Sequence, residues 1–106
     1  MRKVIITVMR KGCYADFIDK YENPIENPCD MEEGMRFVFY NDETADKPEG
    51  LCDSAWETIR PFAVDLAEGA HRYFPGWMKN PDQYMISCND GFRPVSFLLE
   101  AAEDIS

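Results

Sequence analysis

The sequence predicts an α+β fold: one domain over residues 1–106, with a largely antiparallel four-stranded sheet and helices packed on one face. Three observations predict it. Strand-like and helix-like segments follow in the order β-α-β-α-β-β, which lacks the regular alternation of a parallel sheet. The last two strands are close enough in sequence to form a hairpin. The length of 106 residues suits one domain, and no repeat or internal boundary divides it.

Residues 2–10 are predicted to form a central strand. They are rich in β-branched side chains, and both sides of the strand are apolar, so both faces are expected to need cover. Gly12 ends this strand, and residues 14–21 follow as a short helix with its aromatic side chains on one side. Two Asn-Pro pairs then place residues 22–34 in a loop.

A second strand is predicted for residues 35–40, where side chains alternate in character. The most sustained helical periodicity of the chain then predicts a helix over 53–68. Ser54 and Glu57 form a capping-box pattern at its start. Pro61 lies inside this helix. Because the apolar register continues past Pro61, a kinked helix is favoured, and two short helices remain the alternative. The apolar stripe comprises Leu51, Ala55, Trp56, Ile59, Phe62, Ala63 and Leu66, and Gly69 is typical of a C-cap.

Residues 70–82 form an irregular segment rich in aromatic side chains. Such a segment more often folds back on a core edge than lines a ligand pocket. The predicted hairpin then pairs residues 83–88 with residues 95–100. Its connection contains an Asp-Gly turn signal that begins at Asp90.

The charge of the chain excludes some classes of partner. Twenty acids against eleven bases give a formal charge of −9, with no basic cluster for nucleic acid or an anionic membrane surface. No stretch approaches the roughly 20 apolar residues of a spanning helix, and the N-terminal apolar run is too short for a signal peptide. We therefore expect a cytoplasmic protein whose cysteines are reduced thiols or metal ligands.

Several blocks distributed over almost the whole chain share a distinctive pattern. These are Gly12 with Tyr14, Cys29 with Gly34 and Phe37, residues 49–56 (EGLCDSAW), Phe74-Pro75 with residues 77–81 (WMKNP), and residues 88–95 (CNDGFRPV). In these blocks the chain resembles a family of small prokaryotic proteins with no established function. It departs from the family pattern at Asp30 and at Gly76. The resemblance implies no activity, cofactor or catalytic residue.

The residues favour a small binding domain over an enzyme. We predict a pocket for a small molecule or an anion at the N-terminus of the 53–68 helix, and no catalytic residues. No acyl-transfer triad is available except through His71, the one histidine, and no phosphate-binding loop is present. The predicted ligand-binding residues are Cys52, Trp56, Trp77, Cys88 and Arg93.

Two other hypotheses stay open. Cys29, Cys52 and Cys88 could bind zinc or an iron–sulfur cluster, with His71 as a fourth ligand. Against this, none of these thiols belongs to a C-x-x-C pair, and free cysteine commonly packs as a small apolar residue. The last hypothesis is a non-catalytic interaction module, including a homodimer, that uses a sheet edge or the aromatic segment.

Overall fold

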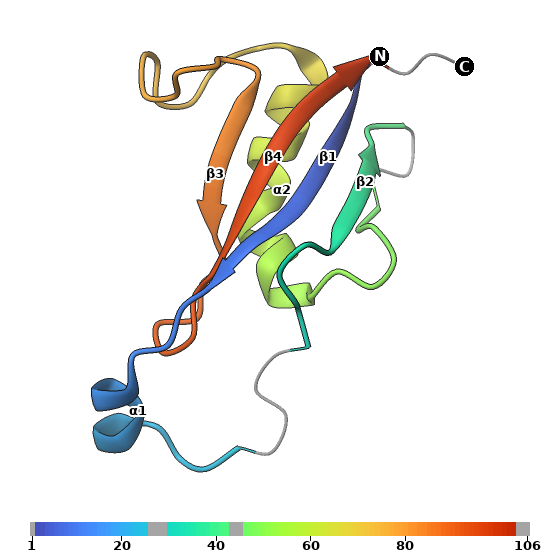
Figure 1. Ribbon diagram of the computed structural model, residues 1–106. Coiled ribbons are helices and arrows are strands. Elements are labelled where there is room, and N and C mark those ends of the chain that lie inside the picture. The colour runs from blue at the N-terminus through green and yellow to red at the C-terminus, as the bar shows by residue number, and fades with distance from the viewer. Residues whose placement is uncertain (1, 26–29, 43–45, 104–106) are drawn as a thin grey trace.

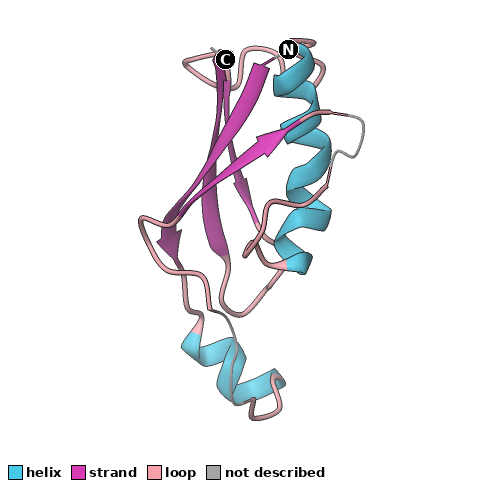
Figure 2. Ribbon diagram, turned by 90° about the vertical axis from the view of Figure 1, so that its right-hand side faces the viewer, coloured by secondary structure: helices cyan, strands magenta, loops and turns pink. Residues whose placement is uncertain are grey.

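The computed structural model describes residues 2–25, 30–42 and 46–103, and it confirms the predicted α+β class and element order. The elements are β1 (Arg2–Lys11), α1 (Ala15–Tyr21), β2 (Arg36–Tyr40), α2 (Asp53–Glu68), β3 (Gln83–Ser87) and β4 (Val95–Glu103). The strands form one antiparallel sheet in the spatial order β2-β1-β4-β3 (Figure 1). Helix α2 covers one face of this sheet, whereas α1 lies beyond the ends of the strands (Figure 2).

The core lies between the sheet and α2. Strand β1 is a central strand, as predicted, and it buries Val4, Ile6 and Val8 on the side of α2. The apolar stripe of α2 meets these side chains because its buried residues recur every three to four positions. Each fully buried aliphatic or phenylalanine side chain contributes about 1.5–3 kcal/mol, so this layer dominates the stability. Other core residues are Phe39, Ala55, Ile59, Ala63, Leu66, Phe97 and Leu99.

No described segment covers the opposite face of the sheet (Figures 1 and 2). The sequence predicted cover for both faces of the first strand, and this expectation is met on one face only. Ile5 is half-buried and Met9 is exposed. The physical reason is that α2 is the one long helix among the described residues, and a single helix covers a single face.

The start of α2 differs from its predicted capping. Cys52 is the N-cap residue and its side chain makes no capping hydrogen bond, so the capping box predicted at Ser54 is wrong. The N-cap lies two residues before Ser54, and Asp53 is the first residue of the helix. Lys47 stabilises this entry, because its ammonium group forms an ion pair with Asp53 at 2.9 Å and donates to the carbonyl of Leu51.

The interior and the end of α2 agree with the sequence. The helix continues through Pro61 as one element, so the interpretation as two short helices is wrong. Gly69 ends it in the left-handed conformation, with φ of 68°. The N–H of Ala70 donates to the carbonyl of Asp65, and the N–H of Gly69 donates to that of Leu66, both at 3.1 Å. This pair of bonds is the Schellman motif.

Strand β4 of the predicted hairpin is longer than expected. It runs three residues past its predicted end, because β1 pairs with it along its length. The connection is organised by Asp90, whose Oδ1 atom accepts the N–H groups of Phe92 at 2.8 Å and of Arg93 at 3.1 Å. The φ of Gly91 is not left-handed, so the two-residue Asp-Gly turn is not formed.

Candidate functional site

Two predicted ligand residues, Cys52 and Trp56, lie in the first turn of α2. The N–H of Trp56 donates to the carbonyl of Cys52 at 3.0 Å. The indole of Trp56 packs on the ring of Phe39, with centroids 5.1 Å apart, and the residue is only 9% exposed. Cys52 packs against the same core with partial exposure. The observed contacts of both residues are those of core packing.

Two more predicted ligand residues, Cys88 and Arg93, lie in the connection between β3 and β4. Cys88 follows β3, packs against the core, and accepts the N–H of Val95 on its Sγ atom at 3.2 Å. The guanidinium group of Arg93 forms an ion pair with Glu22, just after α1. Arg93 therefore ties α1 to the hairpin connection in this structure.

The fifth predicted ligand residue, Trp77, lies far from Cys52. Trp77 belongs to the loop after α2, and its ring lies 6.4 Å from that of Tyr84, near the start of β3. A helix of 16 residues is about 24 Å long. The structure thus separates Trp77 from Cys52 by most of the length of α2.

The predicted metal set includes Cys29, which lies outside the described residues. A zinc or iron–sulfur site at Cys29, Cys52 and Cys88 therefore remains a prediction. Within residues 2–25, 30–42 and 46–103, no three His, Cys, Asp or Glu side chains form a group that could hold a metal ion.

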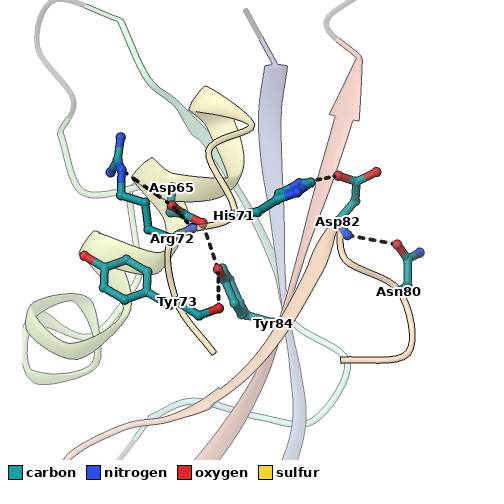
Figure 3. Close-up of polar contacts among 7 residues, drawn as sticks. All are labelled: Asp65, His71, Arg72, Tyr73, Asn80, Asp82 and Tyr84. Atoms are coloured by element: carbon teal, nitrogen blue, oxygen red, sulfur yellow. Dashed lines mark hydrogen bonds and ion pairs between the residues drawn. The ribbon is translucent and has the colours of Figure 1, made fainter. Parts of the chain in front are cut away.

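Asp65, which the sequence analysis did not single out, is the one fully buried charged side chain in the described part of the chain. Its Oδ2 atom accepts the hydroxyl of Tyr84 at 2.7 Å, and its Oδ1 atom accepts the N–H of Arg72 at 3.0 Å (Figure 3). The guanidinium of Arg72 lies 3.9 Å from the same carboxylate. It also forms an ion pair with Glu68, which lies one turn after Asp65 in α2. The buried charge is therefore both hydrogen-bonded and paired, as burial requires.

The environment of Tyr84 favours its protonated form. The pKa of Tyr84 is raised from 10 to about 12, chiefly because the buried phenol would lose its hydration as a phenolate. The hydrogen bond to Asp65 and the negative charge of that carboxylate contribute to the same rise. The hydroxyl also lies 3.3 Å from the carbonyl of Tyr73. Tyr84 thus remains a hydrogen-bond donor at neutral pH and links β3, α2 and the following loop.

The loop between α2 and β3, residues 69–82, has an unusual backbone. Gly69 and Gly76 have positive φ, which glycine adopts readily, but so do His71, at 53°, and Phe74, at 47°. For a residue with a Cβ atom this conformation costs about 1–2 kcal/mol. Such strain persists only where the surroundings fix it, and it is common at ligand sites. Here the fixing contacts come from Asp65 and Tyr84, and from Asp82, whose Oδ1 lies 3.3 Å from the Nε2 of His71.

This loop encloses a cavity of about 210 Å³ against the start of β3. Aromatic rings dominate its surroundings: Phe62 of α2 lies 4.8 Å from Tyr73, and 6.0 Å from the nearly parallel ring of Phe74. A second hollow, of about 350 Å³, also borders Phe74 and extends to Trp77, which is 50% exposed. Tyr73, Phe74, Met78 and Tyr84 provide apolar walls, and His71 and Gln83 provide polar groups.

The sequence marked this loop as a core-capping segment or, less often, a pocket wall. The structure shows both features, because Tyr73 and Met78 pack on the core while Phe74 and Trp77 remain exposed beside the two hollows. Ring faces with a few polar groups are the usual composition of a small-molecule site. We therefore take this cavity as the candidate functional site.

Comparisons of the chain with family models, with curated proteins and with solved structures give no match. The resemblance to a family of small prokaryotic proteins thus stays a prediction. Among the described residues, no helix is both long and apolar enough to cross a membrane.

Proposed function

We propose that the protein is a small-molecule-binding domain whose site is the cavity between loop 69–82 and the start of β3. The observation that supports this most is the cavity of about 210 Å³ beneath a loop with strained backbone at His71 and Phe74. A loop that only capped the core would need neither the strain nor the buried carboxylate of Asp65. Of the predicted ligand residues, Trp77 comes nearest to this pocket, because it borders the neighbouring hollow that shares Phe74 and Pro75 with it.

The walls favour a planar, largely apolar ligand. Exposed rings at Phe74 and Trp77 meet edge to face with centroids 5.1 Å apart, so a flat aromatic molecule can stack on one ring and contact the edge of the other. His71 and Gln83 supply polar groups in the lining of the cavity of about 210 Å³. A heteroaromatic ring system with one or two hydrogen-bonding atoms matches this lining. We also propose a cytoplasmic location, in keeping with the free thiols of Cys13, Cys52 and Cys88.

The proposal can be tested with small planar probes. Indole, quinoline and benzimidazole would each be titrated into the isotope-labelled protein, and amide shifts would be mapped by NMR. We expect shifts in residues 71–78 and 83–84 for at least one probe. The apparent affinity for that probe should be at least fivefold weaker in Phe74→Ala and in Trp77→Ala, because each substitution removes a stacking surface.

The matched control is Phe17→Ala, which removes an exposed aromatic ring on α1, away from the cavity. Its binding should equal that of the wild type. The proposal is wrong if no probe shifts these amides at millimolar concentration, or if the shifts map to the sheet and survive the Phe74 and Trp77 substitutions.

A further inference from the structure

Helix α1 carries an apolar surface that no described segment of its own protomer covers. Its seven residues bury no side chain. Tyr14, Phe17 and Tyr21 recur at helical spacing and share one side, and Tyr21 is 67% exposed. Ile25 adds a further exposed apolar side chain after the helix. A helix of seven residues is not stable in water alone, so this element needs contacts beyond its own hydrogen bonds. We call these four residues the α1 surface.

Contacts at both ends hold α1 in a fixed place. The N–H of Tyr14 donates to the carbonyl of Phe92 at 2.8 Å, and the N–H of Gly12 donates to the carbonyl of Pro94 at 2.7 Å. At the other end, Glu22 forms its ion pair with Arg93. The helix is therefore attached to the hairpin connection, beyond the ends of the strands (Figure 1). From this position it lies on neither face of its own sheet (Figure 2).

The sheet has a matching uncovered face. Side chains alternate along a strand. In each of the four strands, the residues that alternate with the core residues therefore lie on the side of the sheet opposite α2. A hollow of about 290 Å³ lies there between Met9, Arg10, Met85 and Ser96, and it is wide enough for an aromatic side chain. We call this side the open face. Its apolar residues are Ile5, Met9, Val38, Tyr40, Met85 and Leu98, and its charged residues are Lys3, Arg10, Arg36 and Glu100.

We propose that two copies of the chain form a two-fold dimer in which the α1 surface of each copy packs on the open face of the other. The net charges favour this pairing over the stacking of two open faces. The open face carries three bases and one acid, a net +2 on a chain of −9. Residues 13–25 carry three acids and one base, a net −2, or −1 when Glu22 is counted with its ion-pair partner Arg93. Two stacked open faces would bring like charges together, whereas α1 on the open face brings opposite charges together.

The area is that of a weak dimer. A two-turn helix is about 10 Å long and 10 Å wide, so one contact on a sheet buries on the order of 200 Å² counting both sides. Two-fold symmetry makes the contact twice, which gives roughly 400 Å², below the roughly 1,000 Å² of a stable specific interface. The dimer should therefore dissociate on dilution rather than be permanent.

Sedimentation velocity of the full chain at concentrations from about 5 µM to 1 mM tests the proposal. We expect the wild type to shift from monomer to dimer across this range. Phe17→Lys on α1 and Val38→Asp on the open face each place a charge against a partner surface of the same sign, so each should keep the protein monomeric, with at least a tenfold weaker association. Circular dichroism of both variants would show that they stay folded, because both positions are exposed.

A mixture of the two variants gives the sharpest result. Phe17→Lys retains an intact open face and Val38→Asp retains an intact α1 surface, so the mixture regains one of the two contacts. We expect it to form a heterodimer, weaker than the wild-type dimer, although neither variant associates alone. Phe74→Ala, in the cavity loop, should dimerise like the wild type, which separates this proposal from the proposed binding function.

Three results would overturn the dimer. The first is a wild type that stays monomeric at 1 mM. The second is a dimer that persists in Phe17→Lys, which would mean that α1 takes no part. The third is a mixture of the two variants that remains monomeric while the wild type dimerises, because reciprocal packing requires complementation.

Discussion

The hydroxyl of Tyr84 donates a hydrogen bond of 2.7 Å to the Oδ2 atom of Asp65, and both residues are buried. This bond joins β3 to α2. The other carboxylate oxygen accepts the N–H of Arg72, so the same side chain also fixes the first residues of loop 69–82. One buried carboxylate thus connects the core to the wall of the candidate cavity. Its removal should affect stability and the shape of the cavity together.

We expect Asp65→Ala to lower the free energy of unfolding by about 2–4 kcal/mol, because it leaves the phenol of Tyr84 and the N–H of Arg72 without their partner. Tyr84→Phe removes one donor and should cost less, about 1–2 kcal/mol. Urea unfolding would measure both. In the double variant the combined loss should be smaller than the sum of the two, because the two residues share one bond. Strict additivity would contradict the energetic role of this pair.

The same pair predicts a pH dependence at high pH. The pKa of Tyr84 is about 12 in the folded protein, above the ordinary value of 10. Its contribution to stability is therefore fully present below about pH 10 and is lost as the pH rises toward 12. We expect the stability difference between wild type and Tyr84→Phe to shrink over this window. Ultraviolet difference titration of the two proteins should show a phenol with a midpoint near 12. A midpoint near 10 would contradict the burial argument.

The sequence predicts the fold well where local patterns decide it. β-Branched residues predicted the first strand, alternation predicted the second, and the apolar stripe predicted α2. The exit cap at Gly69 followed from residue type. The entry cap did not, because the N-cap is Cys52, and Lys47 pairs with Asp53 from the segment that precedes the helix. That contact spans a turn which periodicity does not describe.

The candidate site was harder to predict. Asp65 lies beside the apolar stripe of α2, and its partners are 7 and 19 residues away in the chain. No local pattern links such positions. His71 and Phe74 adopt positive φ without being glycine or asparagine, the residue types that usually indicate it. The central position of β1 was predicted from the sequence. The open face of the sheet was not, because it depends on where the chain places α1.

Two glycines provide a test of the backbone conformation in the cavity loop. A Cβ atom at Gly76 or at Gly91 would meet no atom within 4 Å, so neither substitution causes a clash. Gly76 has φ of 80°, whereas the φ of Gly91 is not left-handed. We expect Gly76→Ala to cost about 1 kcal/mol. Gly91→Ala should be neutral or stabilising by up to about 1 kcal/mol, through the unfolded chain. Thermal unfolding would measure both, and equal effects would contradict the assigned loop conformation.

Pro61 lies inside α2 at an exposed position, where it lacks the N–H that would bond to the carbonyl of Glu57. We expect Pro61→Ala to stabilise the protein by about 1–2 kcal/mol. Proline costs about 3 kcal/mol relative to alanine within a helix, and the greater freedom of the unfolded alanine chain offsets part of this gain. Arg60→Ala, at the preceding exposed position, is the matched control and should change stability by less than about 0.5 kcal/mol. Urea unfolding of both variants measures the difference. A loss of stability in Pro61→Ala would contradict this expectation and would show that Pro61 helps to seat Phe62, whose ring centroid lies 4.8 Å from that of Tyr73 and 5.4 Å from that of Tyr84.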